Sequence, residues 1–228
     1  MNISDRYIKN MNLLSSEENL KLKDFRVCVV GCGGLGGYVI ELLGRLGIGE
    51  ITAVDGDAFD FSNLNRQILA DETTIGLGKA DTAKVRMAKV NSDVLVTPIT
   101  TFLIDSNCDE IIAGHHVVVD ALDNMQTRVM LEAHCKKLNI PLVHGAIAGW
   151  YAQISTILPG DDILSKIYPA DSNKGIEVEI GNPSFTPAMT AAIEVSEVVK
   201  LLFKKGDVLS NKLLTINLLT CEFDIFEF

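Results

Sequence analysis

Short apolar runs alternate along this chain with longer segments whose apolar residues recur at helical spacing. The continuous run "RVCVV" (26–30) is typical of a strand buried on both faces of a parallel sheet. "EITAVD" (50–55) predicts a second strand. The segment between them predicts a helix that ends at Gly47 and Gly49, with an inward face formed by Leu35, Val39, Leu42, Leu43 and Leu46. Together these segments predict a β-α-β unit.

The same alternation continues to the end of the chain. It predicts, in order, a helix over 80–90, strands over 94–99 and 116–120, a helix over 125–138, and one or two strands within 141–160. Thr186 and Pro187 have the residue types of an N-cap and a first helical position, so the last helix is expected to run from there to Gly206. Residues 213–228 alternate as the strands of a terminal hairpin do.

These elements predict an α/β fold, Rossmann-like, with a mixed but mostly parallel sheet, helices on both faces and a C-terminal β-hairpin. Residues 1–24 are polar and predict an N-terminal arm, and residues 25–228 predict a single domain. The segment at about 160–183 is rich in Asp, Gly, Pro, Ser and Asn and has no periodicity, so we expect a long surface loop that crosses the domain.

Composition and charge narrow the classes of function. The 228 residues carry a formal net charge of −10, which argues against a nucleic-acid partner. Neither a signal peptide nor a run of apolar residues long enough for a membrane span is present, so we expect a cytoplasmic protein. No two of the five cysteines form a C-x-x-C pair, and we expect no zinc. Cys32 lies near a predicted helix N-terminus, but we expect it to pack as a small apolar side chain.

The stretch "GCGGLG" (31–36) connects the first strand to the first helix. Gly31, Gly33 and Gly36 satisfy G-x-G-x-x-G in the strand-to-helix context that binds phosphate, because glycines allow close approach and the helix N-terminus offers free N–H groups. Asp55 ends the second strand, where an acidic residue would bind ribose hydroxyls. A dinucleotide such as NAD and a nucleoside triphosphate fit these features equally well.

Three charged residues further along the chain favour the triphosphate. Arg66, in "SNLNRQ", and Lys79, at the start of the next predicted helix, would each add a cation near the glycine loop. Asp123 follows the strand that ends at Asp120, at the same edge of the sheet. Two cations and a carboxylate suit ATP with Mg²⁺ better than they suit hydride transfer, which remains the alternative.

The motifs "GCGGLG", "DGD", "SNLNRQ", "GLGK" and "DALDN", in this order and spacing, resemble those of the ThiF/MoeB/HesA family, which is related to the ubiquitin-activating enzymes. The likeness covers roughly residues 6 to 220. It implies a homodimeric, ATP- and Mg²⁺-dependent adenylyltransferase. In such an enzyme the C-terminal glycine of a small ubiquitin-fold sulfur carrier protein, ending in Gly-Gly, is adenylated and pyrophosphate is released.

The resemblance also implies the residues of the site. Arg66, Lys79 and Asp123 would be catalytic, and Asp123 would be associated with the metal. The nucleotide would be surrounded by Gly31, Gly33, Gly34, Gly36, Asp55, Asp57, Ser62, Asn63, Leu64, Asn65, Arg66, Gln67, Lys79, Asp123 and Asn124.

The chain departs from the family pattern at its N-terminal arm and in the crossing segment. The arm reads "RYIKN", so Lys9 stands where relatives carry an arginine that reaches ATP across the dimer; Arg6 could supply that contact, or the arm could only pack. The stretch "GIEVEIGNPSFTP" (175–187) has no cysteine, which leaves adenylation as the whole reaction. Trp150 is a candidate to flank the carrier's tail.

Alternatives to this assignment remain open from the sequence. They are adenylation of a different substrate, a NAD-dependent oxidoreductase, and an ATP-binding module without catalysis. Which carrier is used, and in which pathway, is also left open.

Overall fold

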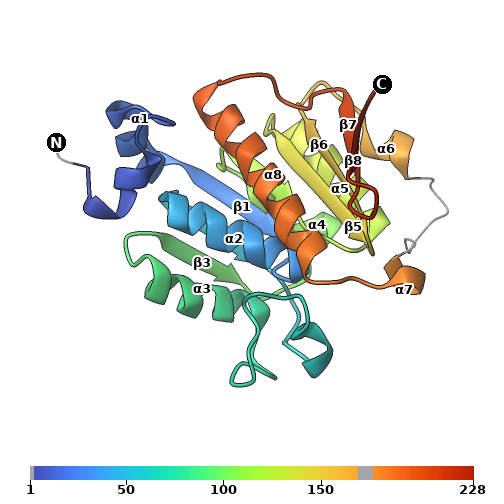
Figure 1. Cartoon of the computed structure of the whole chain (residues 1–228), viewed down its shortest axis with the longest axis horizontal. Coiled ribbons are helices and arrows are strands. Elements are labelled where there is room, and N and C mark those ends of the chain that lie inside the picture. The colour runs from blue at the N-terminus through green and yellow to red at the C-terminus, as the bar shows by residue number, and fades with distance from the viewer. Residues whose placement is uncertain (1–2, 169–176) are drawn as a thin grey trace.

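A single eight-stranded sheet forms the centre of the computed structural model, which describes residues 3–168 and 177–228 (Figure 1). The strand order is β3-β2-β1-β4-β5-β6-β7-β8. The first five strands are parallel, and β6, β7 and β8 are added antiparallel. The strands are β1 (Arg26–Val30), β2 (Glu50–Val54), β3 (Leu95–Ile99), β4 (Val117–Asp120), β5 (Leu142–Ala148), β6 (Tyr151–Ile157), β7 (Lys212–Asn217) and β8 (Glu222–Glu227). This architecture confirms the predicted mixed, mostly parallel sheet and its C-terminal hairpin.

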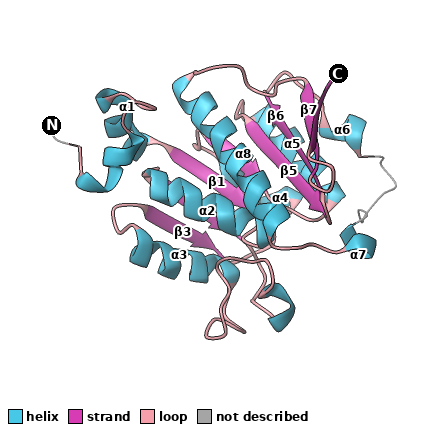
Figure 2. Cartoon of the chain, in the orientation of Figure 1, coloured by secondary structure: helices cyan, strands magenta, loops and turns pink. Residues whose placement is uncertain are grey.

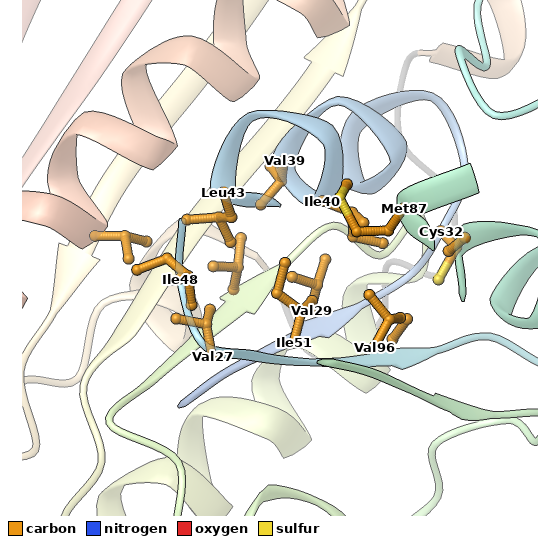
Figure 3. Close-up of a cluster of buried hydrophobic side chains, with 14 of the residues drawn as sticks. Val27, Val29, Cys32, Val39, Ile40, Leu43, Ile48, Ile51, Met87 and Val96 are labelled. Atoms are coloured by element: carbon orange, nitrogen blue, oxygen red, sulfur yellow. The ribbon is translucent and has the colours of Figure 1, made fainter. Parts of the chain in front are cut away.

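Successive residues of β1 pack on opposite faces of the sheet, as a pleated strand requires. Val27 and Val29 belong to the core under α2 (Gly34–Leu46), α3 (Lys79–Val90) and α8 (Phe185–Phe203). Cys28 and Val30 belong to the core on the opposite face. Figure 3 shows the first of these cores, in which the α2 side chains Val39, Ile40 and Leu43 lie over Val27 and Val29. Helices therefore cover both faces of the sheet, as predicted (Figure 2).

The second face is covered by α4 (Asp105–Ile112) and α5 (Met125–Lys137), and α4 was missed from the sequence. This helix has only two turns, and its buried residues are Cys108 and Ile112, four positions apart. Two apolar contacts in eight residues are too few to establish a helical period. Packing against the sheet and α5 supplies the stability that the local pattern does not show.

The predicted surface loop at about 160–183 is wrong for the part that the structure describes. It contains α6 (Leu164–Ile167) and α7 (Glu177–Ile180), and residues 169–176 lie outside the described chain. Ile163 and Leu164 are fully buried against the core under α5. The buried carboxylate of Glu132 accepts hydrogen bonds from both of their backbone N–H groups, at 2.7 and 3.0 Å. A side chain from α5 thus orders a segment that has no period of its own.

The start of α8 also differs from the prediction. The helix begins at Phe185 with Ser184 as N-cap, so Thr186 lies inside its first turn. The Thr186 hydroxyl donates to the Gly149 carbonyl at 2.6 Å, in the β5–β6 turn, instead of capping its own helix. The contact with the β5–β6 turn therefore uses the hydroxyl group that the sequence predicted to cap the helix. The helix ends at Phe203, three residues before Gly206.

The N-terminal arm consists of η1 (Asp5–Asn10), α1 (Ser16–Lys21) and η2 (Leu22–Asp24), which pack against the main body of the chain (Figure 1). Leu14 and Leu22 are buried in the core under α2. Arg6 donates to the Val90 carbonyl at 2.7 Å, so its guanidinium is engaged within its own chain. Among the described residues, no helix combines the length and the apolar character that a membrane crossing needs.

Glu194 of α8 is a buried carboxyl group with neither oxygen hydrogen-bonded in the described structure. It faces Gly145 of β5, where a Cβ atom would contact the carboxyl group. Burial, and next the charge of Asp120, raise the pKa of Glu194 well above its ordinary value. Because an isolated charge in the core costs several kcal/mol, the group is held neutral.

Glu194→Gln is therefore expected to stabilise the protein increasingly as pH rises. Above the ordinary carboxyl pKa of 4.5 the unfolded chain releases this proton while the folded chain keeps it, so the native protein loses stability with rising pH. A neutral amide of the same shape has no such dependence. In urea denaturation, the increase in the free energy of unfolding of Glu194→Gln over the native protein should be larger at pH 8 than at pH 5. Glu110→Gln, on the exposed side of α4, is the control, and an equal or smaller gain for Glu194→Gln at pH 8 would contradict the prediction.

Candidate functional site

An open cleft with a volume of about 180 Å³ lies at the carboxyl ends of β1, β2 and β4. β1 pairs with β2 on one side and with β4 on the other, so the strand order reverses here: β2 and β3 are added on one side of β1, and β4 and β5 on the other. Ligands bind at such switch points in open α/β sheets, because the loops after the two strands diverge and leave a crevice.

The glycine loop forms one wall of the cleft and brings α2 close to the sheet. Gly31 has φ +98°, and a Cβ atom there would lie 2.5 Å from the Ala121 carbonyl oxygen. A Cβ atom on Gly36 would collide with the Gly31 carbonyl oxygen. Gly33 and Gly34 line the cleft at the first turn of α2, which has no side-chain cap. Free backbone N–H groups and the positive end of the helix dipole therefore face the cleft, as an anion site requires.

Asp55 connects the glycine loop to the end of β2. Its two carboxylate oxygens accept hydrogen bonds from the backbone N–H groups of Cys32 and Asp57, both at 2.8 Å. Each oxygen keeps a further lone pair, and Asp55 lines the cleft, so the carboxylate can still accept hydrogen bonds from hydroxyl groups of a ligand. Burial, and next the charge of Asp55, raise the pKa of the Cys32 thiol well above its ordinary value, so this cysteine is no nucleophile near neutral pH.

Lys79 lines the cleft from the N-terminus of α3, although its side chain is almost completely buried. Its Nζ lies 3.1 Å from Asp57 Oδ2, and its backbone N–H donates to the Asp57 carbonyl at 2.9 Å. The half-exposed Asp57 therefore fixes the ammonium group at the cleft wall.

Arg66 also lines the cleft, with its aliphatic stem against Gly34 of the glycine loop. Its Nη1 donates to the Ser62 carbonyl and to Asn65 Oδ1, both at 2.9 Å. The cleft lining does not include the predicted contacts Ser62, Asn63, Leu64 and Asn65. These residues form the turn that holds Arg66, beginning with η3 (Phe61–Asn63).

Gln67, the last residue of that motif, lines the cleft and is 5% exposed. Its side chain lies against Gly33. The Oε1 atom is buried and accepts no hydrogen bond in the described structure. A buried amide group with one unused end is costly unless a ligand completes it.

Asp123 and Asn124 have different positions, although they are adjacent in the chain. Asp123 is exposed and lines the cleft after β4. Asn124 is the N-cap of α5, and its Oδ1 accepts from the Thr127 N–H at 2.9 Å; it does not line the cleft. Lys9, on η1, is exposed and also does not line it.

Sequence reasoning missed Arg128, which is buried at the bottom of the cleft. Its Nε donates to the Leu122 carbonyl at 3.1 Å, and its Nη1 donates to the Tyr168 hydroxyl at 2.6 Å. His144 accepts from that hydroxyl at 3.2 Å and donates to the fully buried Asp120 at 2.7 Å, with tautomer assigned from these partners. Burial lowers the pKa of His144 despite the Asp120 carboxylate, so the imidazole is neutral. A lone arginine in a helix carries no motif that could have identified it.

A second, mostly apolar groove adjoins the cleft. Arg128, Ala146 and Ile147 line both cavities. The groove continues over β5, β6 and β7, with lining residues that include Met125, Ala148, Tyr151, Ala152, Gln153, Tyr168 and Ile216. Trp150 does not line it but packs on Phe185, with ring centroids 4.7 Å apart. An extended chain in this groove would have its end at the cleft.

A Mg²⁺ ion fits the site only together with phosphate oxygens. The described residues contain no group of three or more His, Cys, Asp or Glu side chains that could hold a metal by themselves. Mg²⁺ in nucleotide sites is usually held by one or two carboxylates, substrate phosphates and water. The exposed carboxylate of Asp123 suits that mode.

The ThiF family model matches residues 5–228 of the chain. The SAMP-activating enzyme E1 of Haloferax volcanii is 35% identical over 96% of this chain and 83% of its own length. The molybdopterin-synthase adenylyltransferase of Salmonella typhimurium is 32% identical over 89% of this chain and 82% of its own length. The fold is similar to that of E. coli MccB, solved with ATP, with a TM-score of 0.84, 23% identity, and coverage of 98% of this chain and 71% of that one.

Gly36→Ala is expected to destabilise the fold by at least about 2 kcal/mol, because the new methyl group meets backbone that cannot move without separating α2 from β1. Gly34→Ala is the matched control. A Cβ atom there makes an ordinary 3.5 Å contact with the Arg66 stem, and alanine favours the helix, so the change should stay within about 1 kcal/mol. Equal denaturation midpoints for the two variants would show that the close approach is not required.

Proposed function

Because this chain belongs to the ThiF family and is an adenylyltransferase like those relatives, we propose that it adenylates a ubiquitin-fold sulfur carrier protein. The adenylyl group of ATP would pass to the C-terminal glycine carboxylate of the carrier, and pyrophosphate would leave. The observation that supports this most directly is the convergence of Arg66, Lys79 and Asp123 on the glycine loop in one cleft.

The charges of the cleft suit a triphosphate. Arg66 and Lys79 approach the glycine loop from separate segments, and both are held by hydrogen bonds before any ligand arrives. Cations fixed in advance stabilise developing negative charge without reorganising during the reaction. Bound Mg²⁺ would neutralise phosphate charge next to Asp123.

The reaction itself needs no base. At neutral pH the carrier's carboxylate is already ionised, and one of its oxygens attacks the α-phosphorus. The bond from that phosphorus to the bridging oxygen breaks, and the electron pair leaves with pyrophosphate. The enzyme's task is to align two anions and to stabilise the leaving group, which accounts for a site with cations and no activated nucleophile.

The apolar groove is our proposed binding site for the carrier's tail. It adjoins the cleft at Arg128, Ala146 and Ile147, which line both cavities, and its lining over β5–β7 is mostly apolar. The protein's net charge of −10 would not attract an acidic carrier, so an apolar contact suits recognition better than a charged one. The buried Arg128 would compensate the tail's carboxylate where the two cavities meet.

Lys9 is exposed on η1 and does not line the cleft of its own chain, so a contact with ATP would have to be made in a partner subunit. We propose that the protein is a homodimer in which Lys9 contacts the nucleotide bound to the partner subunit. Sedimentation with and without ATP, for the native protein and Lys9→Ala, would test it.

The experiment that tests the proposed function is ATP–pyrophosphate exchange with purified ubiquitin-fold carriers ending in Gly-Gly. Exchange should require the carrier and should disappear when its last glycine is removed. In a thermal-shift assay ATP with Mg²⁺ should stabilise the protein, and NADH should not. Stabilisation by ATP without exchange for any carrier would instead favour a different substrate or a non-catalytic module.

Lys79→Ala and Arg66→Ala should each lower the exchange rate about 100-fold, which corresponds to about 3 kcal/mol lost in the transition state for one preorganised donor. Lys84→Ala is the matched control, because Lys84 is exposed on the same helix as Lys79. Unchanged exchange in either cleft variant, with wild-type thermal stability, would contradict the roles proposed for these cations.

A further inference from the structure

One wall of the cleft comes from a residue outside all the recognised motifs. Asn182 lies between α7 and α8 and lines the cleft together with Ala146 and Ile147 of β5. Those two β5 residues also line the apolar groove. Asn182 therefore lies near the place where the two cavities join.

The backbone around Asn182 is held from two sides. Asn65 Nδ2 donates to the Asn182 carbonyl at 3.1 Å. On the other side, the Gly149 N–H in the β5–β6 turn donates to the Gly181 carbonyl at 2.7 Å. Two hydrogen bonds from different parts of the fold fix the position from which the Asn182 side chain projects.

Asn65 also connects Asn182 to the cationic wall. While its Nδ2 donates to Asn182, its Oδ1 accepts from Arg66 Nη1 at 2.9 Å. Both ends of the Asn65 amide are used, so this residue is a bridge and not a ligand contact. It links the segment before α8 to the arginine beside the glycine loop.

The Asn182 side chain, in contrast, has an unused end. Its Oδ1 is buried and accepts no hydrogen bond in the described structure. Leaving a buried acceptor unpaired costs free energy. An N–H or O–H donor from a bound molecule would satisfy it.

The chemistry of the two ligands indicates which of them supplies that donor. The triphosphate group of ATP offers only acceptors, and the ribose hydroxyls of ATP, which are donors, are expected at Asp55. A polypeptide tail that enters from the apolar groove carries an N–H group in each peptide unit. Its last peptide unit would pass Ala146 and Ile147, next to Asn182, as its carboxylate enters the cleft.

We propose that Asn182 accepts a hydrogen bond from the last peptide N–H of the acyl substrate and so selects a peptide end at the junction of cleft and groove. The assignment rests on the proposed adenylation of a carrier's C-terminus. Through Asn65, the same contact positions the tail relative to Arg66, which brings the attacking carboxylate and the α-phosphate into register.

The test uses a Gly-Gly-ended carrier prepared with two tails: the natural one, and one in which an ester oxygen replaces the N–H of the last peptide bond. For the native enzyme, the ester tail should raise the KM for the carrier in pyrophosphate exchange about tenfold, as expected for one lost hydrogen bond. Asn182→Ala should raise the KM for the natural tail by a similar factor and should show no further loss with the ester. The KM for ATP should stay within about twofold.

Ser184→Ala is the matched control, since Ser184 is exposed on the same segment, and it should behave as the native enzyme with both tails. An Asn182→Ala enzyme that keeps the full sensitivity to the ester would overturn the assignment. A raised KM for ATP would overturn it too, because the amide would then serve a ribose hydroxyl. If the native enzyme exchanges with neither tail, the proposed function fails, and this assignment fails with it.

Discussion

The distance between helix α2 and the ends of β1 and β4 is the constraint on which the site depends. Gly36 meets the Gly31 carbonyl without an intervening side chain, and Gly31 in turn approaches the Ala121 carbonyl too closely for a Cβ atom. Any side chain at these contacts would push the helix away from the sheet. With the helix this close, its unpaired N–H groups lie in the crevice between β1 and β4, where their partial positive charge is concentrated in a partly dry environment.

Around that crevice each charged side chain is fixed by hydrogen bonds to neighbouring groups. Asp57 holds Lys79, the turn of residues 62–65 holds Arg66, and the Asp55 carboxylate holds the glycine loop itself. The polar residues of the "SNLNRQ" motif therefore act mostly by orienting one guanidinium group. Below them, the network from Asp120 through His144 and Tyr168 to Arg128 joins the sheet, α5 and the end of α6. Each of these four buried side chains has a hydrogen-bond partner within the network, which explains how so many polar groups can be buried.

Elements with strong local patterns were predicted within one or two residues. The parallel strands are continuous apolar runs because helices bury both of their faces, and α2, α3 and α5 carry enough turns to show a helical period. The failures, α4 and the segment at 160–168, are too short to show a helical period, and both pack against α5. Thr186 failed for a related reason, since its hydroxyl bonds to a turn 37 residues away.

The sequence by itself determined the strand ends and the residues that follow them: Gly31 after β1, Asp55 after β2, and Asp123 after β4. Parallel strands bring their carboxyl ends to one edge, so chain order alone predicts that these residues gather there. Only the tertiary structure decided that Asn124 caps a helix, that Arg128 lies between two cavities, and that Asn182 completes the wall. The positions of Arg128 and Asn182 depend on contacts between segments that are far apart in the chain, for example the hydrogen bond between Asn65 and Asn182, 117 residues apart. No local pattern records which of two neighbouring side chains will face a cavity.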